Sequence, residues 1–455
     1  MICFSNVHTL KKDIRKPHNR KRRNISMKKI LSLVLVLMIV LSCVSALAEG
    51  RTKVPAGQIE GGPDVYFVIA SAFFQDGSDI IVIGQKNNSY YKRYDQPVAT
   101  QKVDDDYLLP LDALSKIFQF SYTYDAATGA IHLEDEYVKA DLTVGSKEVT
   151  IDGIADTLGA APAEVEGVLC VPAISVGTKV FALVTGESQG YTYLAYEPTE
   201  LPKGSTGISG SVGRLTIPGK IYGVIEPVYW FEDAQMLMPY RLFVPTCYNP
   251  EVPNALVVFL HGSGGNDNRD VERTLDYNGS GGSGTWWDYA LDQYGLLGLS
   301  VNGYALSYYG SRADSDDPVA ARASELGELE VLAAIAQVKE KYNVDENRVF
   351  IMGNSMGCVG ATWLACKYPE MFAAICACGG FTTKKDMTAV GDMPIRVVSG
   401  TEDPNYNTAL SKYLDYKEKG LNITFRGVGG GFHNTAWSQG DILMETFEFF
   451  ANVKK

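Results

Sequence analysis

The sequence predicts an α/β fold with a mostly parallel, doubly wound sheet, preceded by a smaller α+β domain that contains a repeat. In the C-terminal half, apolar runs of strand length alternate with helix-like segments, which is the order that a parallel sheet with crossover helices requires. In the N-terminal half, two stretches about sixty residues apart share one pattern of apolar, Gly and Pro residues. The length of 455 residues and the apolar content of 46% fit two folded domains.

The C-terminal half places its strands and its longest helix in a clear order. The apolar run 255–260 predicts a buried strand, and 296–301 predicts the next one. A long helix is expected to follow, with Asp317 as its N-cap and Pro318 at its first position. Active sites in such sheets lie at the carboxyl ends of the strands. The remaining strands are expected at 348–352, 373–378, 395–398 and 423–426.

Each copy of the N-terminal repeat joins an apolar run that ends in Gly to a later run that contains Pro. The Gly-to-Pro spacing is 26 residues in the first copy and 27 in the second. A short helix-like segment and a strand of alternating polarity are expected after each Pro. The paired runs are 81–84 with 107–111, and 142–145 with 169–173; the helices are expected at 112–118 and 174–178, and the strands at 120–124 and 191–196.

This repeat pattern resembles the copper amine oxidase N-terminal-like domain that occurs in secreted bacterial proteins. The resemblance is carried by 107–114 and by 124–131 and covers roughly residues 55–198. It implies an accessory domain, either one that contacts cell wall, polysaccharide or a partner, or a structural spacer. No copper is expected, because His132 is the only histidine of the region.

The N-terminal residues predict export. Residues 27–48 combine a basic start, an apolar middle and the small-residue pattern Ala46-Leu47-Ala48, which is typical of a secretory signal peptide. Residues 1–26 are interpreted as an extension ahead of the true start. Localisation is therefore expected to be extracellular or at the cell surface. A lipid anchor on Cys43, in a loosely lipobox-like context, is the less favoured alternative.

The charge balance excludes a nucleic-acid role. Removal of residues 1–48 takes away ten Lys/Arg and one acidic residue, which leaves 31 basic and 52 acidic residues and a net charge of −21. Such a surface repels phosphate backbones and anionic lipids. The mature domains are expected at 49–198 and 221–455, joined by a linker at 199–220 that is rich in Pro, Gly, Ser and Thr.

No cofactor and no metal are expected. The mature chain has three histidines, none of them beside a pair of cysteines, which argues against zinc. The acidic run 314–317 lacks the spacing of a calcium loop, and helix capping accounts for Asp317. Most of the six remaining cysteines are expected to be buried small apolar residues.

Ser355 lies in the string Gly353-Asn354-Ser355-Met356-Gly357, between an apolar strand and an apolar helix. A serine in this context fits a nucleophile elbow, the sharp turn that presents a catalytic hydroxyl. A serine hydroxyl needs a histidine to accept its proton and a carboxylate to orient that histidine. The sequence therefore predicts a serine hydrolase if those partners are present.

Few histidines are available to act as the general base. His433 follows the last predicted strand and is the expected general base. Asp403 follows the strand that ends at Val398, and the order Ser355, Asp403, His433 is that of this hydrolase class. Glu402 is the alternative acid, since one residue of turn geometry decides which carboxylate faces the imidazole.

The glycine-rich run His261-Gly262-Ser263-Gly264-Gly265 supplies the remaining part. Small residues after a strand allow backbone N–H groups to approach a developing oxyanion. We expect the oxyanion hole to be formed by the N–H of Met356 and that of Gly262 or Ser263. His261 is expected to stabilise the loop through hydrogen bonds.

These motifs resemble the α/β-hydrolase fold and, within it, the secreted esterases related to feruloyl esterases, acetyl-xylan esterases and polyhydroxybutyrate depolymerases. The resemblance runs from about 240 to 450, and Cys358 stands where those relatives usually have another Gly. It implies a carboxylic ester hydrolase with an acyl-enzyme intermediate. It rests on the five segments 240–245, 260–265, 344–350, 353–357 and 368–374.

The substrate is the least determined part. Tyr304, Tyr308 and Trp437 lie on loops near predicted strand ends and are candidates for stacking on a sugar or an aromatic acyl group. We expect a carbohydrate ester or plant-polymer ester as substrate, with possible cell-wall contact through the N-terminal domain. Two alternatives remain, a peptidase similar to prolyl oligopeptidase and a surface-binding protein with a vestigial hydrolase domain.

Overall fold

The computed structural model describes residues 69–85, 91–201, 215–217, 220–267, 285–303, 307–381 and 383–455. The predicted signal peptide, Cys43, Tyr304 and most of the predicted linker lie outside these ranges. No helix within them is both long and apolar enough to cross a membrane.

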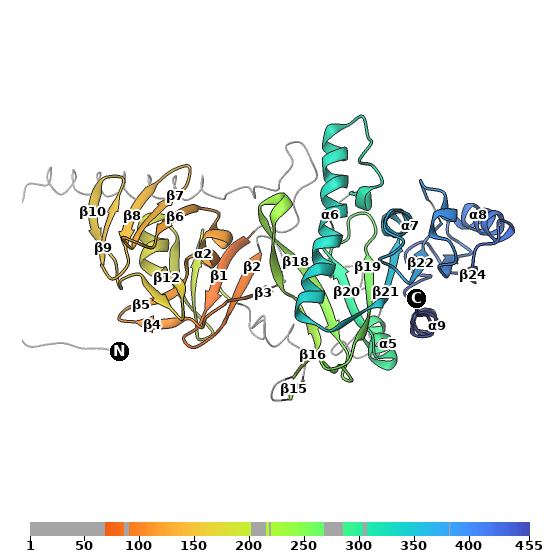
Figure 1. Cartoon of the computed structure of the whole chain (residues 1–455), viewed down its shortest axis with the longest axis horizontal. Coiled ribbons are helices and arrows are strands. Elements are labelled where there is room, and N and C mark those ends of the chain that lie inside the picture. The colour runs from red at the N-terminus through yellow and green to blue at the C-terminus, as the bar shows by residue number, and fades with distance from the viewer. Residues whose placement is uncertain are drawn as a thin grey trace, which may run out of the picture. The chain divides into compact units, whose positions relative to one another are not determined.

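The N-terminal domain is β-rich and consists of three antiparallel sheets around a shared apolar core (Figure 1). The first contains, in spatial order, β13 (Val184–Ser188), β14 (Tyr191–Ala195), β1 (Ile69–Phe74), β2 (Ile80–Gln85) and β3 (Tyr91–Asp95). The second contains β10 (Ile154–Thr157), β9 (Glu148–Ile151), β8 (Lys139–Thr143), β7 (Ala130–Glu134) and β6 (Ser121–Asp125). The third contains β11 (Ala163–Val165), β12 (Val168–Pro172), β5 (Asp106–Pro110) and β4 (Gln101–Val103).

The internal repeat has a direct structural meaning. The strands that carry its two Pro-containing runs, β5 and β12, pair with each other in antiparallel register, with Leu109 opposite Val171. A helix follows each strand: α2 (Leu111–Phe118) in the first copy, and α3 (Ala173–Ser175) with η1 (Val176–Val180) in the second. The Asp106 carboxylate accepts the first N–H groups of the second helix, from Ile174 at 2.8 Å and Ser175 at 2.9 Å. The first copy therefore caps the helix of the second.

The C-terminal domain is built on one large sheet in which six adjacent strands run parallel (Figure 1). These are β20 (Leu297–Val301), β19 (Asn254–Leu260), β21 (Val344–Asn354), β22 (Ala374–Cys378), β23 (Ile395–Gly400) and β24 (Ile423–Val428). Antiparallel strands extend the β20 edge: β18 (Met236–Val244), β16 (Lys220–Ile225) and β15 (Leu215–Ile217), with β17 (Val228–Phe231) paired to β18. The six parallel strands agree with those predicted from the apolar runs.

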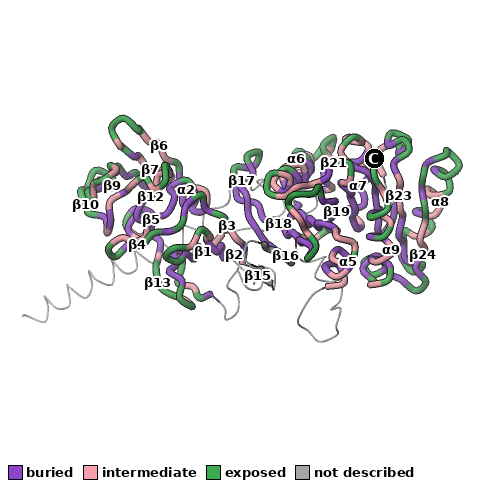
Figure 2. The backbone as a smooth tube through the Cα atoms, turned by 60° about the horizontal axis from the view of Figure 1, so that its bottom comes forward, coloured by how far each residue is buried: buried purple, intermediate pink, exposed green. Residues whose placement is uncertain are grey.

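Helices cover both faces of this sheet, as a doubly wound fold requires. The core on one face includes residues of α6 (Pro318–Lys341), α7 (Met356–Lys367) and α8 (Tyr406–Glu418), and the core on the other face includes α5 (Trp286–Tyr294) and α9 (Gly440–Ala451). Figure 2 shows β18 and β19 in the colour of buried residues, consistent with a sheet covered on both sides. The long helix begins as predicted, since the Asp317 carboxylate accepts the Val319 N–H at 3.0 Å and Pro318 occupies the first turn.

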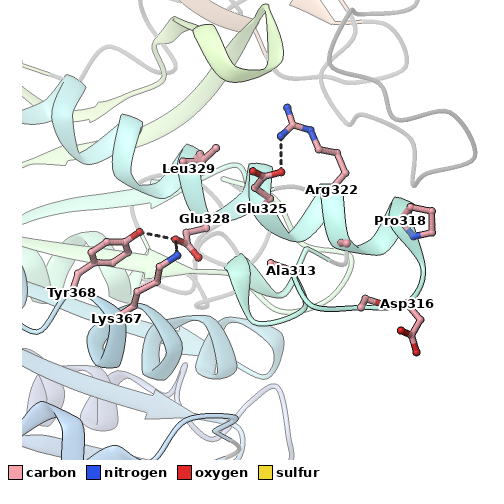
Figure 3. Close-up of a pocket in the computed structure, with 11 residues that line it drawn as sticks. Ala313, Asp316, Pro318, Arg322, Glu325, Glu328, Leu329, Lys367 and Tyr368 are labelled. Carbon is pink, nitrogen blue, oxygen red and sulfur yellow. Dashed lines mark hydrogen bonds and ion pairs between the residues drawn. The ribbon is translucent and has the colours of Figure 1, made fainter.

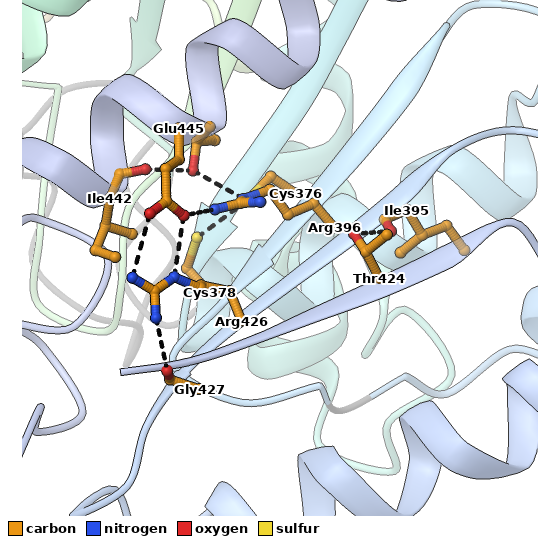
Figure 4. A network of polar contacts seen from close by, with 10 residues as sticks. Cys376, Cys378, Ile395, Arg396, Thr424, Arg426, Gly427, Ile442 and Glu445 are labelled. Atoms are coloured by element: carbon orange, nitrogen blue, oxygen red, sulfur yellow. Dashed lines mark hydrogen bonds and ion pairs between the residues drawn. The ribbon is translucent and has the colours of Figure 1, made fainter. Parts of the chain in front are cut away.

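A network of ion pairs links α9 to β23 and β24 at one edge of the sheet (Figure 4). The carboxylate of Glu445 on α9 accepts hydrogen bonds from the guanidinium groups of Arg396 on β23, at 2.7 Å, and Arg426 on β24, at 3.0 Å. Beneath it, the Sγ atoms of Cys376 and Cys378 lie 3.6 Å apart, and both cysteines are buried and unbridged. Cys170 and Cys358 are also buried, whereas Cys247 is exposed and Cys366 is intermediate.

The strand order reverses direction at β19. The chain moves from β19 to β20 on one side and then returns to β21 on the other side of β19. A reversal of this kind separates the crossover connections and leaves a space outside the strand ends, where ligands bind in such sheets. The segments that begin at His261 and Ser355 leave the sheet at this point.

Candidate active site

Ser355 occupies a strained turn between β21 and α7. Its backbone angles are φ 56° and ψ −111°, a region that residues with a side chain rarely adopt. The turn is held because the Ser355 N–H donates to the Cys378 carbonyl at 3.0 Å and the Ser355 carbonyl accepts the Cys358 N–H at 3.0 Å. This is the geometry predicted for a nucleophile elbow.

The two glycines of the elbow permit close backbone approach. A Cβ at Gly353 would overlap the Gly357 carbonyl, and a Cβ at Gly357 would overlap the Leu260 carbonyl. The start of α7 therefore lies directly against the backbone at the end of β19. Cys358 is accommodated beside them, buried, with its thiol donating to the Gly380 carbonyl at 3.3 Å.

The three residues predicted to act together form one line of hydrogen bonds. His433 Nε2 lies 2.8 Å from Ser355 Oγ, and His433 Nδ1 lies 2.8 Å from Asp403 Oδ2. The Asp403 side chain is fully buried, while 28% of the His433 side chain is exposed. Asp403 Oδ1 accepts the Asn405 N–H at 2.8 Å, which fixes the orientation of the carboxylate.

The structure also distinguishes the two neighbouring acids. Glu402 is exposed, and its backbone N–H donates to the Gly431 carbonyl at 3.0 Å. That contact, together with Thr401 N–H to Val428 O at 2.9 Å, joins the turn after β23 to the loop after β24. Asp403 therefore faces the imidazole, and Glu402 faces solvent.

The predicted oxyanion donors lie on two segments whose backbones touch, the start of α7 and the loop after β19. Met356 is the first residue of α7, where helical N–H groups have no partner within their own helix. Gly262 is buried and Ser263 is exposed on the loop that follows β19. Because Gly357 touches the Leu260–His261 backbone, the start of α7 and this loop lie side by side.

His261 is fully buried, and both of its ring nitrogens contact backbone carbonyls. Nδ1 lies 2.7 Å from the Gly262 carbonyl, and Nε2 contacts the Asn302 carbonyl. The Tyr309 hydroxyl donates to the His261 carbonyl at 3.2 Å. This arrangement agrees with the predicted role in loop support.

The predicted aromatic substrate contacts require a correction. Trp437 is 2% exposed and packs against Phe259 at a centroid distance of 5.0 Å, so it belongs to the core beneath α9 and is unsuited to stacking on a substrate. Tyr308 is half-buried, with the Arg312 guanidinium 3.5 Å from its ring centroid. A substrate contact by Tyr308 stays a prediction, and Tyr304 lies outside the described residues.

Sequence reasoning missed Phe432, which precedes the base. Its side chain is 62% exposed, an unusual position for a large aromatic residue. Its place beside His433 was the available signal. It is an exposed apolar side chain one residue before His433.

Sequence reasoning also missed a group of buried charges under the His261 loop. Lys92 of β3 pairs with Asp267 at 2.6 Å and with Glu226 at 3.3 Å. Glu330 of α6 is fully buried and accepts the Gly303 N–H at 3.1 Å. Burial, with a smaller effect of the Asp267 charge, raises the pKa of Glu330 to about 8. Lys92 and Asp267 are 175 positions apart in the sequence, and no local sequence pattern predicts that they pair.

A pocket of about 740 Å³ lies elsewhere, between α6 and the end of α7 (Figure 3). It includes none of the predicted site residues. Its central carboxylate, Glu328, is already paired with Lys367 and receives Tyr368 at 2.6 Å and Trp363 at 3.0 Å.

Comparison with family models now assigns both domains. Residues 330–439, which contain Ser355, Asp403 and His433, match the model described as "Putative esterase". The chain carries an esterase domain of the α/β-hydrolase fold. Residues 85–194 match "Copper amine oxidase N-terminal domain", in agreement with the resemblance of the repeat.

Solved structures provide further similar chains. The fluorophosphonate-binding serine hydrolase F of Staphylococcus aureus is 15% identical, with 51% of this chain and 99% of that chain covered at a TM-score of 0.39. A ferulic acid esterase of Anaeromyces mucronatus is 14% identical, with 53% and 94% covered at 0.40. A thermostable esterase is 17% identical, with 78% and 98% covered at 0.42. A search of the curated proteins found no match. TM-scores below 0.5 do not identify a substrate.

Proposed function

We propose that the chain is an exported serine esterase in which Ser355 is the nucleophile, His433 the general base and Asp403 the residue that orients the base. One observation carries the proposal: the unbroken line from Asp403 through His433 to Ser355, each link 2.8 Å long, which ends at a strained elbow. The match of residues 330–439 to an esterase model supports an ester as substrate.

The geometry suits acyl transfer. His433 Nε2 takes the Ser355 Oγ proton as the oxygen attacks the ester carbonyl, and Asp403 stabilises the imidazolium that forms. The negative oxygen of the tetrahedral intermediate receives N–H bonds from Met356 and from Gly262 or Ser263, each worth about 3 kcal/mol. The imidazolium then protonates the leaving alcohol, and water, activated by the same base, releases the acid from Ser355.

We propose esters linked to carbohydrate or plant polymer as the substrate class. The motif resemblance to feruloyl and acetyl-xylan esterases supports this choice, and the exposed Phe432 ring beside the base offers an apolar contact for an acyl group. The signal-peptide pattern of residues 27–48 supports export to where such polymers occur. The proposal includes wall contact by the N-terminal domain, testable as retention of the Ser355→Ala chain on insoluble wall polysaccharide.

The test compares the wild-type chain with Ser355→Ala on p-nitrophenyl acetate and then on feruloylated and acetylated oligosaccharides. Wild-type turnover and its loss in the variant, with an unchanged circular dichroism spectrum, are expected. Labelling of the wild-type chain by a fluorophosphonate at Ser355 provides an independent readout. Equal turnover in the two chains would refute the assignment of Ser355.

A further inference from the structure

The esterase domain contains a buried cation that belongs to the other domain. Lys92 lies on β3, an edge strand of the N-terminal sheet, and only 1% of its side chain is exposed. The strand approaches the segment ahead of β17, where the Arg93 N–H donates to the Glu226 carbonyl at 2.8 Å. This backbone contact aims the Lys92 side chain into the esterase domain.

The Lys92 ammonium pairs with the carboxylate of Asp267, the last residue of the loop 261–267 that carries the predicted oxyanion donors. Its Nζ lies 2.6 Å from Asp267 Oδ2 and 3.3 Å from Glu226 Oε1. The Asp267 side chain is only 4% exposed. A carboxylate at this depth is held in place only if a cation and hydrogen bonds compensate for the loss of water.

His261 and Asp267, the first and last residues of this loop, both contact Asn302. The Asn302 amide donates to Asp267 Oδ1 at 3.1 Å, and the Asn302 carbonyl contacts the His261 ring. The loop from 261 to 267 is thereby tied at both ends to the residue that follows β20. Gly262 and Ser263, the predicted donors, lie between these two ties.

Removal of the Lys92 charge would leave acidic groups facing one another. Glu226 and Asp267 both pair with Lys92, so their two negative charges would lie close together without a cation between them. Glu330 lies near enough for the Asp267 charge to contribute to its raised pKa. Repulsion would push Asp267 away and shift the loop. A misplacement of a catalytic donor by about 1 Å lowers turnover by about 10²-fold.

We propose that Lys92 is a positioning residue for the oxyanion hole, supplied to the esterase domain by the N-terminal domain. The proposal rests on the proposed function of Ser355 and its oxyanion donors. It gives the N-terminal domain a part in turnover in addition to any contact with the cell wall.

The test measures inhibition by an aryl trifluoromethyl ketone, which forms a tetrahedral oxyanion adduct with a serine nucleophile. The inhibition constant does not depend on the fraction of folded enzyme, so a merely structural role would leave it unchanged. We expect Lys92→Met to weaken the inhibitor at least tenfold and to lower kcat by a similar factor, with KM within twofold. The matched control is Lys341→Met, which breaks another contact between the same domains, the exposed 3.0 Å pair of Lys341 with Asp95, and is expected to change neither value.

An unchanged inhibition constant in Lys92→Met would overturn the proposal. If that variant does not fold, Asp267→Asn decides, because it keeps an oxygen for the Asn302 amide and removes only the charge that Lys92 pairs with. We expect it to weaken the inhibitor about threefold, and an unchanged value would again overturn the proposal. Failure of the wild-type chain to bind the inhibitor or to label at Ser355 would instead refute the proposed function.

Discussion

His261 and His433 follow two strands of the same sheet, yet their surroundings differ in every respect. His261 is fully buried, and its ring nitrogens contact the carbonyls of Gly262 and Asn302. His433 is partly exposed and lies between the Asp403 carboxylate and the Ser355 hydroxyl. A base needs a reacting partner on one nitrogen and a negative charge on the other.

The difference shows how one residue type serves two tasks within one site. The His261 ring contacts backbone carbonyls of its loop and of Asn302, whereas His433 contacts a carboxylate and a hydroxyl, as the proposed general base requires. Three substitutions test this division and a fourth tests the buried carboxylate near the His261 loop, taken from the largest expected effect to the smallest.

Replacement of His433 by Ala is expected to have the largest effect. Without the imidazole, Ser355 loses its proton acceptor, and kcat for p-nitrophenyl acetate should fall by about 10⁵- to 10⁶-fold. The control is His132→Ala, a partly exposed histidine of the N-terminal domain, which should leave kcat unchanged. Comparable kcat values in His433→Ala and His132→Ala would contradict the assignment of His433 as the general base.

Asp403→Asn should lower kcat by about 10⁴-fold, because an amide no longer favours the tautomer that accepts the serine proton. Glu402→Gln is the matched control, one residue away and exposed, and its kcat should stay within twofold of wild type. Steady-state kinetics of both variants on one ester make the comparison. A larger loss of kcat in Glu402→Gln than in Asp403→Asn would assign the role of the acid to Glu402.

His261→Ala should have an intermediate effect of a different kind. Loss of the contacts to Gly262 and Asn302 should lower kcat by about 10- to 100-fold through displaced loop donors. It should also lower the free energy of unfolding by about 1 to 3 kcal/mol, because buried carbonyls lose their partner. Thermal denaturation and labelling of Ser355 by a fluorophosphonate separate the two parts. A loss as large as that in His433→Ala would contradict the division of tasks.

Glu330→Gln should change the pH dependence of stability and leave the chemistry in place. The Glu330 pKa of about 8 in the folded chain lies above its ordinary value of 4.5, so the folded chain retains a proton that the unfolded chain has released between these pH values. Wild-type stability therefore falls as pH rises from about 4.5 to 8, and this contribution is absent in the amide variant. Between pH 5 and 8 we expect the variant to lose on the order of 1 to 3 kcal/mol less than wild type.

Melting temperatures of both chains at the two pH values measure this difference. The amide oxygen of Gln can still accept the Gly303 N–H, so the hydrogen bond at this position is conserved. Parallel pH profiles of wild type and variant would show that Glu330 is ionised at both pH values.

The elements, and the residues of the proposed site, could be located from the sequence because their signals are local. Apolar runs located the parallel strands, and Asp317 with Pro318 located the start of α6. Residues 49–455 contain three histidines, which left few choices for a base. The choice between Glu402 and Asp403 depended on the direction of one turn, which only the backbone after β23 determines.

The remaining features depend on contacts between distant parts of the chain. Trp437 and Phe432 are aromatic residues of one loop, yet one is buried and the other exposed, because only the first faces the core beneath α9. The pairing of Lys92 with Asp267 joins two domains and leaves no trace in either local sequence. Burial and long-range charge pairing are properties of the packed molecule.

The backbone angles of Ser355 imply a trade-off between stability and activity that is confined to one residue. A side chain at φ 56° and ψ −111° costs about 1 to 3 kcal/mol of folding free energy, and the surrounding hydrogen bonds must supply it. Ser355→Ala keeps the Cβ and therefore the strain, whereas Ser355→Gly would release it. The stability gained in the glycine variant would measure the folding free energy that the chain gives up to hold the proposed nucleophile in this turn.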